Sequence, residues 1–104
     1  MTSEQRSKIL NELTEKQHKF RNRCKALENI YASRAIAELR QIEPGLPSDR
    51  SAFHLAHNWL VCKGNRQAKQ ILERFAKKQK KLSALQNRHW ERSYQQTMKN
   101  LNTN

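Results

Sequence analysis

The sequence is poor in residues that break regular structure, because its 104 residues include two glycines and two prolines. An all-β sandwich or barrel needs many turns, so this scarcity argues against one, and also against a flexible linker or a collagen-like repeat. One domain is the limit at this length. A hydrophobic fraction of 36% predicts a thin core.

Cysteine is scarce too, since the sequence has two, Cys24 and Cys62. Two cysteines do not make a disulfide framework, so we expect reduced, partly buried thiols that pack as small apolar residues. His54 and His57 share a helix face and could join them in a zinc site, but structural zinc sites usually carry closely spaced cysteine pairs. We therefore expect a partly buried histidine pair, with no metal and no cofactor.

Long apolar runs are missing as well. The polar amino terminus has no apolar run behind it and does not resemble a secretory signal. No stretch approaches the roughly 20 apolar residues of a membrane span. The sequence also lacks a glycine-rich phosphate loop and a paired acidic metal cluster. We expect a soluble, cytoplasmic chain that has no membrane partner and is not an enzyme.

What the sequence does have is a helical period. Most steps between apolar residues up to Ile42 are three or four, and Gln17 fills the one missing slot. Leu13, Phe20 and Leu27 lie seven apart, which is a short coiled-coil-like seam that could pair two chains. This pattern predicts a first helix over about residues 4–43.

Two breaks divide the rest of the chain. Pro44–Pro47 ends the first helix, and Gly45 there can take the left-handed conformation. A short helix over about 49–63 follows, capped by Ser48 or Asp49 and stopped at Gly64.

The third predicted helix covers about residues 66–99, with Asn65 as its cap and residues 100–104 as a disordered tail. Its apolar face comprises Ala68, Ile71, Leu72, Phe75, Leu82, Leu85, His89, Trp90, Tyr94, Met98 and Leu101. The face drifts sideways near Trp90, which predicts a bend or a frayed end. We expect a single all-α domain, an antiparallel hairpin of two long helices with a short connecting helix, forming a small helical bundle.

Acidic residues are few, since 21 Lys and Arg residues face 9 Asp and Glu residues and the formal net charge is +12. Residues 1–43 hold nine basic and six acidic side chains, whereas residues 44–104 hold twelve and three. At about 100° per residue, the main cations of the third helix fall within roughly 80°, opposite the apolar face. This stripe runs from Arg66 to Lys99, roughly 50 Å at about 1.5 Å per residue. The main contacts that we predict on it are Arg66, Arg74, Lys77, Lys81, Arg88 and Arg92.

A solvated helix face usually interleaves both signs, but only Glu73 and Glu91 interrupt this run. We therefore predict that the stripe binds an anion, and nucleic acid fits best because Lys and Arg can contact its phosphates. Lys78 and Lys80 would flank the stripe. Trp90 could stack on an unpaired base, although its helical spacing favours a core position.

Two segments resemble the bacterial primosomal replication protein PriC family: Arg21-Asn22-Arg23-Cys24, and the run from Leu85 to Tyr94 that reads LQNRHWERSY. The resemblance implies an all-helical basic protein. It also implies binding to single-stranded DNA and to the single-stranded DNA-binding protein, and help in reloading the replicative helicase at stalled forks. In that case Arg88 and Arg92 would be DNA or partner contacts.

The function we expect is therefore binding of nucleic acid, DNA in particular, by a small basic helical protein that acts as an accessory in DNA replication or replication restart. The alternative is a protein-interaction adaptor, which could form a homodimer, whose basic helix docks the acidic surface or tail of another protein such as a replication protein.

Overall fold

The computed structural model describes residues 2–102 and contains no strand in that range, which confirms the predicted all-α class. The elements are α1 (Ser3–Ile42), α2 (Ser51–Ala56), the π-helical turn η1 (His57–Val61) and α3 (Arg66–Asn102). The chain divides into two compact units, which are described separately: unit 1 contains residues up to 25 and from 82 onward, and unit 2 contains residues 26–81. That the two act as a single domain stays a prediction.

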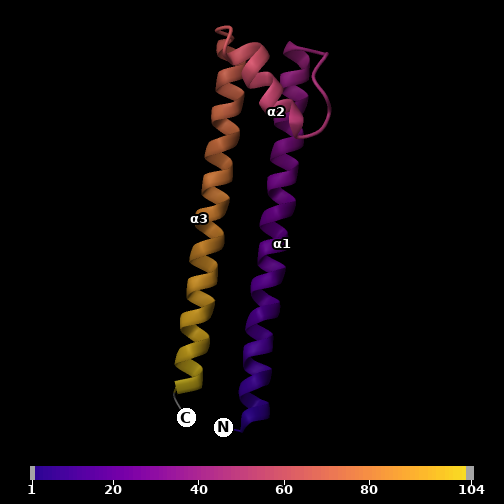
Figure 1. Cartoon of the computed structure of the whole chain (residues 1–104). Coiled ribbons are helices and arrows are strands. Elements are labelled where there is room, and N and C mark those ends of the chain that lie inside the picture. Colours follow the sequence, from indigo (N-terminus) through magenta and orange to yellow (C-terminus); the bar gives the residue numbers. More distant parts are fainter. Residues whose placement is uncertain (1, 103–104) are drawn as a thin grey trace. The chain divides into compact units, whose positions relative to one another are not determined.

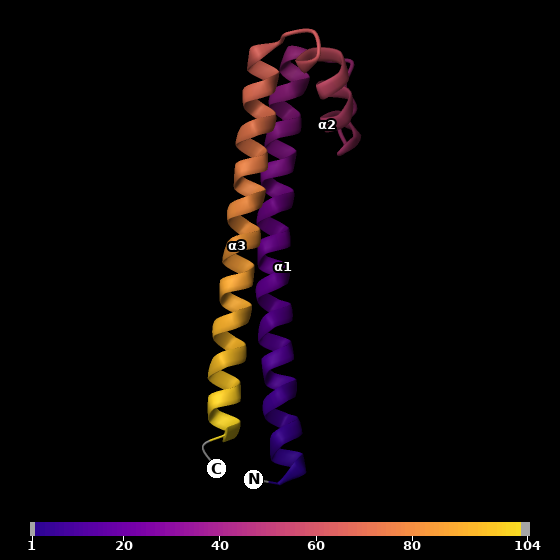
Figure 2. The same cartoon turned by 60° about the vertical axis from the view of Figure 1, so that its left-hand side comes forward.

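Within each unit a segment of α1 runs antiparallel to a segment of α3, as the hairpin prediction requires (Figures 1 and 2). In unit 2 the short helix α2 and η1 join these two segments (Figure 1).

Unit 2 contains the larger core. Leu39 and Leu46 are its largest fully buried side chains. The rings of Phe53 and Phe75 stack with their centroids 4.6 Å apart. Small residues complete the core, namely Ala32, Ala35, Ala52, Ala56 and Ala68. Because the separation of packed helices depends on the side chains at the contact, these alanines allow α1, α2 and α3 to approach closely.

The end of α1 differs from its prediction at Gly45, which does not have a positive φ. The end is closed by other bonds. The Glu43 amide donates to the Leu39 carbonyl at 2.9 Å, and the Leu46 amide donates to the Glu43 carbonyl at 3.1 Å. The Gly45 amide donates to Glu43 Oε1 at 3.0 Å. A carboxylate thus replaces the expected left-handed glycine.

Polar side chains and one glycine set the ends of the other helices. Asp49 Oδ1 accepts hydrogen bonds from the amide and the hydroxyl of Ser51, and these bonds lower the pKa of Asp49. Gly64 has φ +89°, so it provides the predicted stop after η1. The Ala68 amide donates to Asn65 Oδ1 at 2.9 Å, which confirms Asn65 as the cap of α3.

Unit 1 has fewer buried apolar residues, namely Leu13, Cys24 and Leu101. Phe20 stacks on His89 with ring centroids 3.8 Å apart. The α3 helix continues without a break to Asn102, so a frayed end near Trp90 and disorder over residues 100–102 are not found. Residues 103–104 lie outside the described range.

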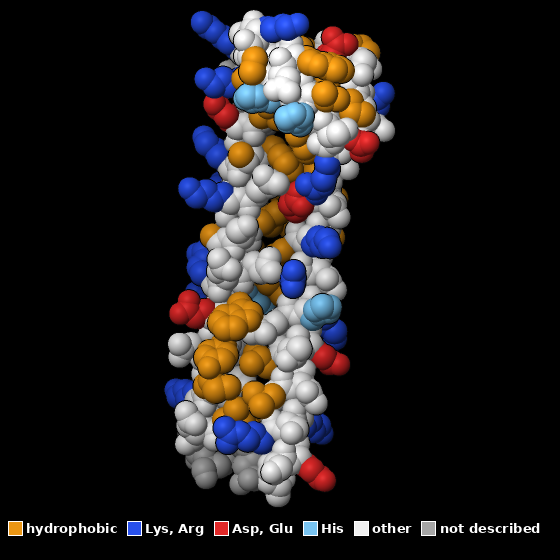
Figure 3. All heavy atoms as spheres, viewed as in Figure 1, with side chains coloured by type: hydrophobic (Ala, Val, Ile, Leu, Met, Phe, Trp, Pro, Cys, Tyr) orange, Lys and Arg blue, Asp and Glu red, His pale blue; other side chains and the backbone are white. Residues whose placement is uncertain are grey.

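Trp90 and Tyr94 are not core residues, which corrects the prediction from helical spacing. Their exposed fractions are 49% and 41%, and Leu85 is also exposed. Between Leu82 and Met98, which are themselves partly buried, the partly buried line of α3 in unit 1 is polar and comprises Gln86, His89, Ser93 and Thr97. A helix presents one line of residues to its neighbour, so the aromatic side chains lie beside this line. Figure 3 shows hydrophobic side chains gathered on the exposed surface of this segment of α3.

Candidate nucleic-acid interface

Unit 2 contains six of the nine predicted contact residues, and the structure leaves all six exposed on α3. They are Arg66, Arg74, Lys77, Lys78, Lys80 and Lys81. The guanidinium of Arg74 lies 3.6 Å from the Glu38 carboxylate, and both side chains are largely exposed. The Lys78 ammonium lies 4.8 Å from the centroid of the Tyr31 ring, a cation–π contact. Among the described residues, the other four cations form no ion pair.

The run Lys77–Lys81 concentrates positive charge on little more than one helical turn. Lys77 and Lys81 lie four residues apart, and Lys78 and Lys81 lie three apart, so like charges are neighbours on the helix surface. Each such pair costs an isolated helix about 0.2–0.5 kcal/mol. A bound polyanion would remove this repulsion, and this relief would favour anion binding to this part of α3.

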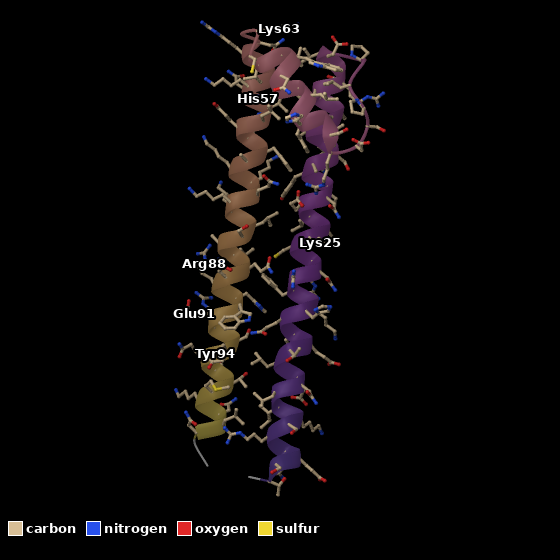
Figure 4. All side chains as sticks on the ribbon, in the orientation of Figure 1. Lys25, His57, Lys63, Arg88, Glu91 and Tyr94 are labelled. Carbon is tan, nitrogen blue, oxygen red and sulfur yellow. The ribbon has the colours of Figure 1, made fainter. Side chains whose placement is uncertain are left out.

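The other three predicted residues, Arg88, Trp90 and Arg92, belong to unit 1 and are also exposed. Figure 4 shows Arg88 and Glu91 on the side of α3 that points away from the α1 segment of this unit. The Trp90 indole stacks on the Tyr94 ring, with centroids 5.2 Å apart and an interplanar angle of 5°. Two cations and a half-exposed aromatic pair are therefore available on this segment.

Unit 1 also contains a cavity of about 240 Å³ that the sequence did not predict. It is lined by Thr14, Gln17, His18, Phe20, Arg21, Gln86, Asn87, His89 and Trp90. One signal in the sequence pointed to it: Gln17 fills an apolar slot of the first helical pattern. Gln86 is not among the apolar residues of the third helix, and only the structure shows that Gln17 and Gln86 line one cavity.

Cys24 packs as a buried apolar residue, as predicted, whereas His54, His57 and Cys62, which we expected to be partly buried, are exposed. His57 Nδ1 lies 3.7 Å from Cys62 Sγ, because residues five apart meet across the wide π-helical turn. Within residues 2–102, no group of three or more His, Cys, Asp or Glu residues is placed to hold a metal ion.

A scan against protein-family models, a search of curated proteins and a search of solved structures all find no match to the chain. Across the described residues, no helix combines the length and the apolar character needed to cross a membrane.

Proposed function

We propose that the chain is a non-enzymatic, cytoplasmic nucleic-acid-binding protein whose contacts lie on the exposed cations of α3. The observation that carries this proposal is the α3 segment of unit 2, where six exposed Lys and Arg side chains include only Arg74 in an ion pair among the described residues. Binding a strand of phosphates would release counterions and relieve the repulsion among these cations.

Single-stranded DNA is the form of nucleic acid that we propose, with an accessory role in replication restart. The support comes from the resemblance of residues 21–24 and 85–94 to the PriC family. The exposed Trp90 adds to it, because aromatic side chains can stack on unpaired bases.

A salt titration of strand binding tests the proposal. The logarithm of the association constant should fall linearly with the logarithm of salt concentration, by about 0.7 for each phosphate neutralised on a single strand. Replacing Lys77, Lys80 and Lys81 together with glutamine should therefore reduce the slope by about 2. Fluorescence anisotropy of a labelled oligothymidylate at several salt concentrations measures both slopes.

A matched control removes the same charge from exposed positions of α1. Replacing Lys8, Lys16 and Lys19 with glutamine also removes three positive charges, but none lies on α3. This control should keep nearly the whole slope. Equal slopes for the wild-type chain and the α3 variant, or equal losses in both variants, would contradict an interface on α3.

A second candidate function is a protein-interaction adaptor that docks an acidic partner on α3 and adds an apolar contact on α1, and one observation favours the apolar contact. Leu27 and Ile30 are exposed neighbours on α1 in unit 2, although large apolar side chains are commonly buried. An adaptor predicts that capture of a protein partner survives nuclease treatment and is weakened by Leu27→Ser with Ile30→Ser. Loss of the captured partner after nuclease treatment would favour the nucleic-acid function instead.

A further inference from the structure

The lining of the unit 1 cavity includes aromatic rings, carboxamides and a guanidinium. The walls include aromatic rings, because Phe20 and His89 stack on each other and Trp90 borders the same space. Carboxamides from Gln17 and Gln86 also line it. The Arg21 guanidinium, the Thr14 hydroxyl and the His18 imidazole also line it, and no carboxylate is among the lining residues.

The indole of Trp90 is placed to receive a second ring. Tyr94 covers one face of the indole at 5.2 Å in a nearly parallel stack, and Tyr94 does not line the cavity. Trp90 itself borders the cavity, so its indole is within reach of a ring bound there. Base–aromatic stacking needs an accessible ring face.

The Gln17 side chain gives independent evidence that the cavity can hold a ligand. Its Nε2 is buried and has no hydrogen-bond acceptor. A buried donor without a partner is costly, so the cavity favours an occupant that offers an acceptor. Gln86 and Asn87 add two more carboxamides, each with donors and an acceptor. Carboxamides of this kind recognise the edges of nucleobases.

The charge and the size of the cavity narrow the class of occupant. Arg21 is exposed and forms no ion pair within the described part of the chain, so its guanidinium is available to a phosphate. The volume of about 240 Å³ lies below the roughly 300–1,000 Å³ typical of drug-sized ligands. A planar ring with carbonyl acceptors and an attached phosphate satisfies all of these conditions.

We propose that this cavity binds one unpaired nucleobase, with Trp90 stacking on the base, Gln17 donating to a base carbonyl and Arg21 contacting the adjoining phosphate. The inference deepens the proposed function and rests on it, because it supplies a base-binding site in unit 1 in addition to the phosphate contacts. A strand and a free nucleotide both offer such a base, and the experiment separates the two sources.

Tryptophan fluorescence tests the stacking directly, since the chain has two tryptophans and each can be isolated. In Trp59→Phe the emission reports on Trp90, and we expect oligothymidylate to quench it. In Trp90→Phe the emission reports on the exposed Trp59 in unit 2, and it should not change. An abasic strand of the same length keeps the phosphates and should bind without quenching. Thymidine monophosphate should quench Trp90 if a free nucleotide also enters the cavity.

Affinity measurements on two variants complete the test. Trp90→Ala should weaken oligothymidylate binding roughly 5- to 150-fold, the range for loss of one stacked base. Gln17→Leu should weaken binding about fivefold, for one hydrogen bond, while the thermal midpoint stays equal or rises because the buried unpaired donor is gone. Trp59→Ala should leave affinity unchanged. A fall in stability without a change in affinity for Gln17→Leu would show a structural role and overturn the inference.

The two proposals can fail separately. Salt-dependent binding of both strands without quenching of Trp90 overturns the base site and leaves the phosphate interface standing. Quenching by thymidine monophosphate, with no salt-dependent strand binding, supports the base site and overturns the proposed function. Equal quenching of Trp59 and Trp90 by oligothymidylate would show nonspecific contact and also overturn the base site.

Discussion

Leu27 and Leu39 lie on the same helix and within the same unit, yet only one contributes to the core. Leu39 is 0% exposed and packs among the buried residues of unit 2, whereas Leu27 is 41% exposed. The sequence places both on one apolar face. Burial therefore depends on which helices actually pack at each level of α1, and the apolar period alone does not give this information.

These two leucines make a matched pair for a stability measurement. Leu39→Ala should lower the free energy of unfolding by about 2–5 kcal/mol, because it removes buried methyl groups and leaves a cavity. Leu27→Ala changes the same atoms at an exposed position and should cost less than about 1 kcal/mol. Urea unfolding followed by circular dichroism measures both. Similar losses for the two variants would contradict the burial described for α1.

At the residue scale, the sequence predicts a helix end correctly where the residue type itself decides the local backbone conformation or hydrogen bond. Gly64 stops η1 with a positive φ, and Asn65 caps α3, as their residue types indicate. Gly45 was predicted in the same way and is different, because the Glu43 side chain bonds to its amide. That competing hydrogen bond cannot be read from the glycine itself.

At the scale of elements, α3 shows where the hydrophobic period predicts burial correctly and where it does not. Its apolar residues from Ala68 to Phe75 face the core of unit 2 as predicted. In unit 1 the same helix presents Gln86 and His89 to α1 and leaves Trp90 exposed. The hydropathy pattern favours burying the largest apolar rings, but an uninterrupted helix presents one line of residues to its neighbour, and the pattern alone does not say which line. The cavity follows from this polar line, which explains why the sequence did not predict it.

The start of α3 offers a test at this scale. Asn65→Ala removes the acceptor for the Ala68 amide and should lower the free energy of unfolding by about 1 kcal/mol, within a range of about 0.5–2 kcal/mol. Asn65→Asp keeps an oxygen acceptor and adds a negative charge at the helix amino terminus, so it should retain or increase stability. Thermal unfolding of the three chains at neutral pH compares them. Equal loss in both variants would show that the cap does not stabilise α3.

The charge of the whole molecule was predictable from composition, and so was its concentration in the later residues. Twelve Lys and Arg residues face three Asp and Glu residues from residue 44 onward. In the structure, the described residues form two ion pairs between charged side chains, Arg50–Glu28 and Arg74–Glu38, and both involve carboxylates of α1. The positive charge is therefore mostly unneutralised within the described chain, so folding must overcome repulsion that depends on ionic strength.

This repulsion predicts that salt and a polyanion each raise thermal stability, and that each weakens the effect of the other. Sodium chloride alone should raise the midpoint of unfolding, because it screens repulsion over a Debye length of about 10 Å at 0.1 M. Oligothymidylate at about 100 times its dissociation constant should raise the midpoint at low salt by roughly 10 °C or more. The two effects should not add, since salt also weakens strand binding. The variant with Lys77, Lys80 and Lys81 replaced by glutamine should start from a higher midpoint at low salt and gain less from the strand. A strand that stabilises this variant as strongly as the wild-type chain would place the binding surface elsewhere.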